Sequence, residues 1–247
     1  MQAIKNSDSS EIQDLDVPGI CVTCEARLGG ICAVLNSVQL LAMNKAASHK
    51  EWPAGTELIS FGEDVHSYSN IISGVVKLTK TMTDGREQIV GLQFAPDFLG
   101  RPFQDESKVS AEAATKVNLC TFPKSFIDSL IESSSNLKKS LLEQTLSELD
   151  EARDWMLAPG RKTAGEKVAS FIYMIALHID PDRDARVNAV SFDLPLSRAD
   201  VADFLGLTVE TVSRQLTKLR KGNVVEIDHN RHFVIPDIAR LEKFSGK

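Results

Sequence analysis

Apolar and polar positions divide the chain into four stretches with different spacing. The first stretch opens with residues 1–17, which are polar, and continues into a cysteine-bearing segment, ICVTCEARLGGICAVL. Apolar residues then recur at helical spacing from Val38 to Met43. We predict an N-terminal arm over residues 1–45 that ends in a helix.

Short alternating runs, broken by glycine and proline, follow from Trp52 to Phe122. Many short strands at near-regular spacing are typical of a β-barrel or sandwich. Asp84-Gly85 lies between the strand-like runs VVKLTKTM and EQIVGLQF, and glycine tolerates the positive φ that a hairpin turn requires. We predict a β-domain over residues 46–124 with a hairpin tip at Asp84-Gly85.

A helical pattern without glycine or proline runs from Ser125 to Leu157. Five apolar or small residues in it recur in steps of 3, 4, 3 and 4, which traces a seam able to pack against an identical helix. These seam positions are Leu142, Thr145, Leu149, Ala152 and Met156. Other apolar residues are predicted to pack on the helix's own β-domain: Leu137, Leu141, Leu146 and Trp155. Because Pro159-Gly160 predicts a helix end and hinge, we assign residues 125–160 to a dimerisation helix; one buried helix is the alternative.

The last stretch, residues 161–247, has the pattern of a winged helix-turn-helix domain. A helix through Val168 and Ile179 comes first, and Ser197 is then a plausible N-cap for a second helix. That helix breaks at Gly206, and Thr208 caps a third. Helix, short glycine turn, helix is the DNA-reading motif, and the runs VVEI and HFVI predict a wing beside it.

The third helix has residues that can read bases at its N-terminal end. Glu210, Ser213 and Arg214 share one face, and the apolar side is assigned to Val209, Val212 and Leu216. Glutamate can accept from cytosine, arginine can donate twice to guanine, and serine can reach either kind of base edge. The alternative is a solvated face with a Glu210–Arg214 ion pair. The candidate phosphate contacts are Thr208, Thr211, Lys218, Arg220 and Lys221.

Charge and composition narrow the class of protein. The net charge of −6 comes from the N-terminal part, because residues 1–162 hold 16 Lys and Arg against 22 Asp and Glu, whereas residues 163–247 hold 12 of each. The C-terminal part is therefore free to concentrate basic residues on one helix. No apolar stretch approaches a membrane span, and the start lacks a secretory pattern, which predicts a cytoplasmic protein without a membrane partner.

The four cysteines are too few for a disulfide scaffold in a chain of 247 residues, so metal or redox chemistry is their leading explanation. Cys21, Cys24 and Cys32 form C-x2-C-x7-C, and Cys120 ends a predicted strand. Four thiolates suit an iron–sulfur cubane or a tetrahedral zinc ion, and the spacing leaves both open. Cys120 as a simple buried residue is a further alternative. A thiol-redox enzyme is disfavoured because no nucleotide-binding glycine loop accompanies the cysteines.

The order of cysteine arm, β-domain, long helix and winged helix-turn-helix resembles the cyclic AMP receptor protein superfamily. The stretch LGLTVETVSRQL carries E-x-x-S-R, the reading signature of its fumarate and nitrate reductase regulator (FNR) branch. The x7 spacing and the segment LTKTMTDGREQIVGLQFAPDFLGRP are typical of the alphaproteobacterial subgroup. The resemblance covers nearly the whole chain.

The resemblance implies an α+β fold with a double-stranded, jelly-roll-like β-roll. It implies a [4Fe–4S] cluster on Cys21, Cys24, Cys32 and Cys120 that favours a homodimer under low oxygen, and oxygen would then abolish DNA binding. Glu210, Ser213 and Arg214 would read a TTGAT-N4-ATCAA palindrome in double-stranded DNA. RNA polymerase would contact exposed loops, with residues 180–190 as one candidate. The hairpin candidates are Thr83, Asp84, Gly85, Arg86 and Glu87.

Two departures from the superfamily lead to further expectations. Where relatives often carry an acidic seam residue, our alignment places Ala152, so we hypothesise appreciable dimer without the cluster. The stretch SKVSAEAATKV lacks the Arg-Ser/Thr-Ala element that holds a cyclic nucleotide phosphate, and Glu112 would repel a phosphate. We therefore expect no cyclic nucleotide as effector and no enzymatic activity.

Overall fold

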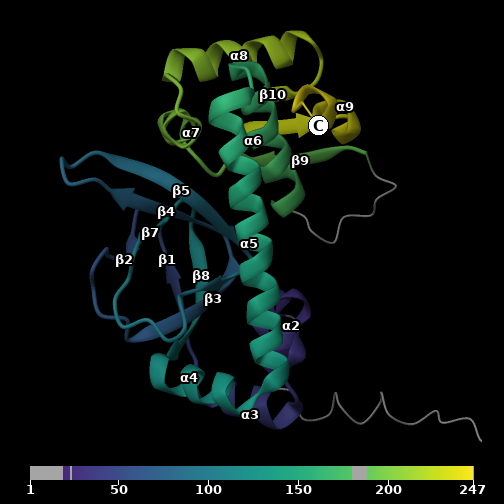
Figure 1. The fold of residues 1–247 in the computed structure, drawn as a ribbon. Coiled ribbons are helices and arrows are strands. Elements are labelled where there is room, and N and C mark those ends of the chain that lie inside the picture. Colours follow the sequence, from purple (N-terminus) through teal and green to yellow (C-terminus); the bar gives the residue numbers. More distant parts are fainter. Residues whose placement is uncertain (1–18, 23, 180–187, 247) are drawn as a thin grey trace, which may run out of the picture.

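Figure 1 shows the computed structural model, which describes residues 19–22, 24–179 and 188–246. Two four-stranded antiparallel sheets form the β-roll, in the orders β1-β8-β3-β6 and β2-β7-β4-β5. Ile71, Val76, Ala111 and Val117 are among the residues that fill the core of the roll. The strands are β1 (Ser48–Trp52), β2 (Glu57–Ile59), β3 (Ser67–Ser73), β4 (Val75–Thr81), β5 (Glu87–Phe94), β6 (Phe98–Leu99), β7 (Ser110–Ala113) and β8 (Val117–Pro123).

The hairpin between β4 and β5 has its tip where the sequence predicts it. The Met82 N–H donates to the Arg86 carbonyl over 2.7 Å, and Gly85 has a φ of +83°. An L-residue with a Cβ rarely adopts this conformation, so glycine permits the turn. The tip extends away from the core of the roll (Figure 1).

The cysteine arm is a chain of short helices packed on the roll: α1 (Gly19–Val22), α2 (Glu25–Gly29), the 3-10 helix η1 (Ile31–Val34) and α3 (Ser37–Ala46). Asn36 and Gln39 form a reciprocal capping box that starts α3, which confirms the predicted helix. Ile31 and Leu35 are buried against Tyr68 of β3 and Phe122 of β8. The prediction for residues 1–17 lies outside the described residues.

The predicted long helix is two helices, α4 (Lys124–Ser133) and α5 (Ser135–Arg161). Ser134 breaks the pattern with an extended conformation (φ −118°, ψ 108°), and its hydroxyl accepts from the Leu137 N–H over 3.3 Å. Serine side chains compete for helix backbone groups in this way, which favours caps over helix interiors. The predicted end at Pro159-Gly160 is confirmed to within one residue, because α5 ends at Arg161.

The apolar residues outside the seam pack in three different ways. Leu137 and Leu141 lie against the cluster shared by the arm and the roll, as predicted. Trp155 instead meets Phe204 of the C-terminal domain edge-on, with ring centroids 4.9 Å apart. Leu146 remains 50% exposed, so its predicted packing on the roll is wrong. Helix α5 therefore connects both domains.

The C-terminal domain has the predicted winged helix-turn-helix fold. Its elements are α6 (Ala164–Ile179), β9 (Val190–Asp193), α7 (Arg198–Leu205), α8 (Val209–Lys221), β10 (Glu226–Asp228), β11 (His232–Ile235) and α9 (Ile238–Phe244). The wing sheet has the order β10-β11-β9, so it gains a strand beyond the two predicted. Phe171, Val212 and Phe233 are fully buried in its core. Within the described ranges, no helix is long and apolar enough to cross a membrane.

Candidate nucleic-acid interface and cysteine site

Local side-chain bonds set the helix-turn-helix geometry. The Ser197 hydroxyl accepts from the Asp200 N–H over 3.1 Å and caps α7. Gly206 ends α7 in the left-handed region with a φ of +61°. The Thr208 hydroxyl accepts from the Thr211 N–H over 3.2 Å and caps α8. Each cap is worth about 1 kcal/mol, so the motif is specified locally.

The outward face of α8 carries the predicted base-reading residues. Glu210, Ser213 and Arg214 are exposed, whereas Val212 and Leu216 are buried beneath them. Val209 is 41% exposed, so its assignment to the apolar side is wrong. Val209 is the first residue of α8, and the buried residues of the helix come in the turns that follow it.

The alternative to base reading was a solvated face with an ion pair between Glu210 and Arg214. The described part of the chain contains no such ion pair. Hydrogen bonds from its own backbone N–H and from the Thr208 hydroxyl lower the pKa of the Glu210 carboxyl. Its carboxylate therefore stays ionised as an acceptor at the helix N-terminus, where the helix dipole also favours negative charge. Arg214 keeps its guanidinium on the same exposed face.

The predicted phosphate contacts fall into two groups. Thr208 and Thr211 hold their hydroxyls 3.1 Å apart in the cap of α8. Lys218, Arg220 and Lys221 are exposed in the last turn of the same helix. The three basic side chains lie at the C-terminal end of α8, whereas the base-reading residues lie toward its N-terminal end. This distribution is suited to a backbone contact on either side of a groove.

Sequence reasoning missed Arg198, which joins α7 to the wing. Its Nη2 donates to the Asn230 carbonyl over 3.2 Å, and its guanidinium lies 5.5 Å from the Phe233 ring centroid. The sequence signal was an arginine directly after the capping Ser197. Arg198 fixes the wing tip relative to the helices that would meet DNA.

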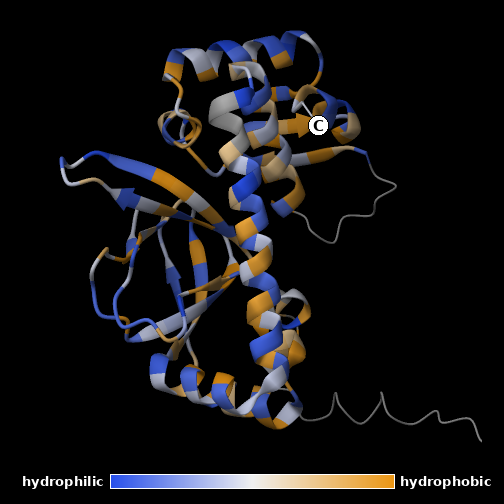
Figure 2. Cartoon of the chain, in the orientation of Figure 1, coloured by the Kyte–Doolittle hydropathy of each residue, from blue (hydrophilic) through white to orange (hydrophobic). Residues whose placement is uncertain are grey.

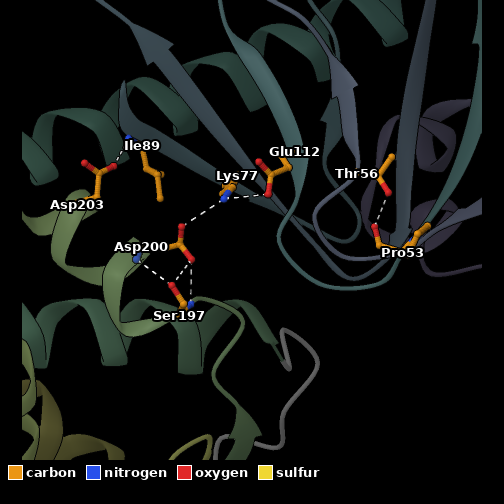
Figure 3. Close-up of polar contacts among 8 residues, drawn as sticks. All are labelled: Pro53, Thr56, Lys77, Ile89, Glu112, Ser197, Asp200 and Asp203. Carbon is orange, nitrogen blue, oxygen red and sulfur yellow. Dashed lines mark hydrogen bonds and ion pairs between the residues drawn. The ribbon is translucent and has the colours of Figure 1, made fainter. Parts of the chain in front are cut away.

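A second set of missed contacts ties α7 to the β-roll (Figure 3). Lys77 on β4 lies 3.0 Å from a Glu112 carboxylate oxygen and 3.3 Å from one of Asp200. Asp203 accepts from the Ile89 N–H of β5 over 2.7 Å. Burial alone would lower the pKa of Lys77, but its bonds to the two carboxylates raise it above the ordinary value. These contacts hold the helix-turn-helix against the β-roll.

Asp203→Ala is expected to lower the free energy of unfolding by about 1–2 kcal/mol, because the partly buried Ile89 N–H loses its acceptor. The matched control is Asp203→Asn, whose amide oxygen can still accept and should lose less than half as much. Denaturant unfolding measures both values. An unchanged midpoint for Asp203→Ala would contradict a stabilising role for this contact.

The four cysteines line one cavity of about 250 Å³, although they come from distant segments. Cys21 and Cys24 belong to the start of the arm, Cys32 lies in η1, and Cys120 lies in β8. All four are free thiols and partly buried. The Asn70 amide Nδ2 donates to the Cys32 Sγ over 3.3 Å. The fold therefore brings together the four cysteines that the sequence analysis had grouped only by residue type.

The surroundings favour the neutral thiols until a cation is present. Burial, and then the neighbouring cysteines, raise the pKa of both Cys32 and Cys120 to about 12. Burial also raises the pKa of Cys21, with Cys24 adding to the effect and Arg27 opposing it. A bound metal group would supply the positive charge that the thiolates lack, so binding would release protons.

Within the described ranges, no group of three or more His, Cys, Asp or Glu side chains is arranged to hold a metal ion. A tetrahedral zinc site needs its four sulfurs about 2.3 Å from one point. A cubane cluster instead takes each of its four thiolates on a different iron, so the sulfurs lie further apart. The four cysteines that line the cavity are the residues that would hold either group.

The predicted dimer seam is open to solvent along α5. Leu142, Leu149 and Met156 are 59%, 43% and 77% exposed, and Thr145 and Ala152 are exposed between them. Figure 2 shows hydrophobic positions alternating with polar ones along this helix. Such a row of apolar side chains is available to a partner helix.

The hairpin candidates for a polymerase contact, Thr83, Asp84, Gly85, Arg86 and Glu87, are all exposed. Arg86 pairs with Asp84 over 2.8 Å and lowers the pKa of that carboxyl. The loop 180–190 was the second candidate, and most of it lies outside the described residues.

Comparison with known proteins agrees with this architecture. Residues 49–134 match the cyclic nucleotide-binding domain family, and residues 166–244 match the Crp-like helix-turn-helix domain family. The chain is 50% identical over 234 residues to a probable transcriptional activator of Rhizobium leguminosarum bv. viciae, covering 95% of this chain and 96% of the relative. It is 37% identical to the transcriptional activator protein FnrL of Cereibacter sphaeroides, covering 94% and 95%.

Among solved structures, FixK2 from Bradyrhizobium japonicum superposes with a TM-score of 0.70 at 28% identity, covering 80% of this chain and 96% of that one. The two sequence relatives cover 95% and 94% of this chain, and the structural match covers 80% of it. The chain belongs to the Crp/FNR family of transcriptional regulators.

Proposed function

We propose that this chain is a cytoplasmic, homodimeric regulator that binds DNA under low oxygen and loses that binding when oxygen is present. The observation that carries the proposal is the meeting of four cysteines from the arm and β8 at one cavity. Cys21, Cys24, Cys32 and Cys120 would hold a [4Fe–4S] cluster. When bound, such a cluster would supply an oxygen-sensitive link between the arm and the roll.

The protein's own packing offers a route from the cysteine site to the seam. Cys32 and Ile31 lie in η1, and Ile31 shares an apolar cluster with Leu137 and Leu141 of α5. Ordering of the arm therefore supports the first turns of the helix that carries the seam. A second copy packed on that seam would place two recognition helices for the two halves of a palindrome.

Contacts with DNA would divide into reading and positioning. Arg214 would donate to guanine, Glu210 would accept from cytosine, and Ser213 would bond either edge in TTGAT-N4-ATCAA. Thr208, Thr211, Lys218, Arg220 and Lys221 would bond phosphates. The exposed hairpin tip of residues 83–87 would contact RNA polymerase during activation.

The β-roll would act without a cyclic nucleotide, although its family takes its name from that ligand. Glu112 lies on β7 and pairs with Lys77, so the segment presents a carboxylate where a phosphate would need a cation. Lys77 is already bonded to two carboxylates. The roll then serves as the scaffold that places Cys120.

The test is anaerobic purification with iron and sulfide assays and a visible spectrum, followed by air exposure during binding to a TTGAT-N4-ATCAA duplex. We expect about four irons per chain, with bleaching and loss of DNA binding in air. A zinc-bound protein with unchanged binding in air would overturn the oxygen mechanism. It would leave a DNA-binding regulator with a structural metal.

The neutral seam position Ala152 leads to a separate prediction. Without the cluster, the protein should still form appreciable dimer, because like charges do not face each other at this position. Ala152→Asp should shift the cluster-free protein toward monomer by adding that repulsion. Sedimentation velocity of both proteins measures the shift, and a wild-type sample containing monomer alone would refute the prediction.

A further inference from the structure

Asn70 of β3 is a buried amide that lines the cysteine cavity beside apolar side chains of the arm and the roll. It is 1% exposed, and the neighbouring Tyr68, on the same face of the strand, is equally buried. Tyr68 packs in one cluster with Ile31 of the arm and Phe122 of β8. Burying an amide among such side chains is costly unless its polar atoms are bonded. Packing alone does not account for an asparagine here.

Two relationships place Asn70 between cysteines of separate segments. Its Nδ2 donates to the Cys32 Sγ over 3.3 Å. In the register of β3 and β8, Asn70 lies directly opposite Cys120. Directly opposed residues share a face of the sheet, with Cβ atoms about 5 Å apart. Asn70 therefore bonds one candidate ligand and stands beside another.

The second polar atom of the Asn70 side chain is its amide oxygen. Asn70 Oδ1 is buried and has no hydrogen-bond partner among the described residues. A buried acceptor without a partner costs about 1–3 kcal/mol. The fold retains this amide despite that cost, and the one bond it makes goes to the sulfur of Cys32.

We propose that Asn70 is a positioning residue of the cysteine site. It holds the Cys32 sulfur beside Cys120 and donates a hydrogen bond to that sulfur when the sulfur is a metal-bound thiolate. The inference rests on the proposed function. Donors to ligand sulfurs stabilise their negative charge, which raises the reduction potential of the bound group and slows its loss.

Asn118 provides a matched control. It is also an asparagine, it lies two positions before Cys120 on β8, and it lines the same cavity. Unlike Asn70, it makes no hydrogen bond to a sulfur in the described part of the chain. A change at Asn118 alters the polarity and volume of the cavity without removing the contact to Cys32.

The experiment compares Asn70→Leu, Asn70→Asp and Asn118→Leu with the wild type after anaerobic reconstitution with iron and sulfide. Asn70→Leu removes both polar atoms, and Asn70→Asp keeps the shape but loses the donor when ionised. Three quantities are measured: the rate at which a ferrous chelator removes iron without oxygen, the midpoint potential, and the thermal unfolding midpoint of the cluster-free protein.

We expect both Asn70 variants to lose iron about tenfold faster than the wild type or more, with a lower midpoint potential. Asn118→Leu should remain within about twofold of the wild type, because it leaves the Asn70 donor to the Cys32 sulfur in place. The cluster-free Asn70→Leu protein should unfold at or above the wild-type temperature, because the unpaired Oδ1 is gone. A purely structural role would instead lower that temperature.

The outcomes separate the inference from the proposed function. A wild-type protein that takes up no iron and sulfide overturns the proposed function and the inference with it. A wild-type protein that binds a cluster, with Asn70→Leu and Asn70→Asp as durable as Asn118→Leu, overturns the inference alone. An equal loss in all three variants would assign the effect to cavity polarity and would also overturn the role of Asn70.

Discussion

Arg214→Ala is expected to weaken binding to a TTGAT-N4-ATCAA duplex by about 1–3 kcal/mol per half-site, roughly 5- to 150-fold. The exposed guanidinium on the outward face of α8 is the group suited to a bidentate bond with guanine. The variant should also lose its preference for guanine at that position. Anaerobic binding titrations with the consensus duplex and with a duplex changed at the guanine measure both effects.

Lys218→Ala is the control, because Lys218 lies in the last turn of the same helix. A phosphate contact there should weaken binding to all duplexes alike and reduce the salt slope by about one. If Arg214→Ala behaved as Lys218→Ala does, with full discrimination for guanine, then Arg214 would be a phosphate contact and the assigned reading role would be wrong.

Cys120→Ser is expected to abolish cluster binding and, with it, DNA binding under anaerobic conditions. A serine hydroxyl replaces the thiol at similar size, but it is a poor substitute for a thiolate ligand. The variant should still fold, because Cys120 is only partly buried and its strand is held by β1 and β3. Iron and sulfide content, the visible spectrum and anaerobic gel shifts give the result.

Thr121→Ser is a conservative control on the next position of β8, where the side chain points to the opposite face and bonds the Ser69 hydroxyl over 2.8 Å. It should keep the wild-type iron content. Full iron content in Cys120→Ser would remove Cys120 from the ligand set. It would return that residue to the alternative of a simple buried side chain.

The two changes probe opposite ends of the molecule, and the junction between α7 and the β-roll lies between them. Lys77, Asp200 and Asp203 make this junction through an ion pair and a bond to a strand N–H. Trp155 of α5 adds an aromatic contact to Phe204 of the same helix. Of these contacts, the one between Trp155 and Phe204 joins α5 to α7, and the other two join α7 to the roll.

Local signals in the sequence determined the helix-turn-helix and the hairpin. Ser197, Gly206 and Thr208 act on backbone groups within a few residues of themselves, so their effect could be read without the fold. The same holds for Gly85, whose positive φ belongs to its own turn. The family signature in α8 lies on the face that its helical spacing predicts.

Predictions from the sequence were wrong where two local tendencies compete. Ser134 lies in a pattern that is helical on both sides, and its capping bond to Leu137 broke the helix. Val209 and Leu146 are apolar at helical spacing, yet both are exposed because no second layer covers them in the single chain. The spacing of apolar residues shows which face of a helix can be buried. The element that packs beside the helix decides how much of that face is buried.

By itself, the sequence determined the order of the domains, the elements with strong caps and turns, and the kinds of side chain available for DNA and metal chemistry. Tertiary structure alone decided that Cys120 would share a cavity with the arm, that Asn70 would bond Cys32, and that Lys77 would reach Asp200. The physical reason is how far apart in the chain the interacting residues lie. Caps and turns depend on bonds between near neighbours, whereas these contacts join residues far apart in the chain, which meet only after strands pair in register and helices pack on them.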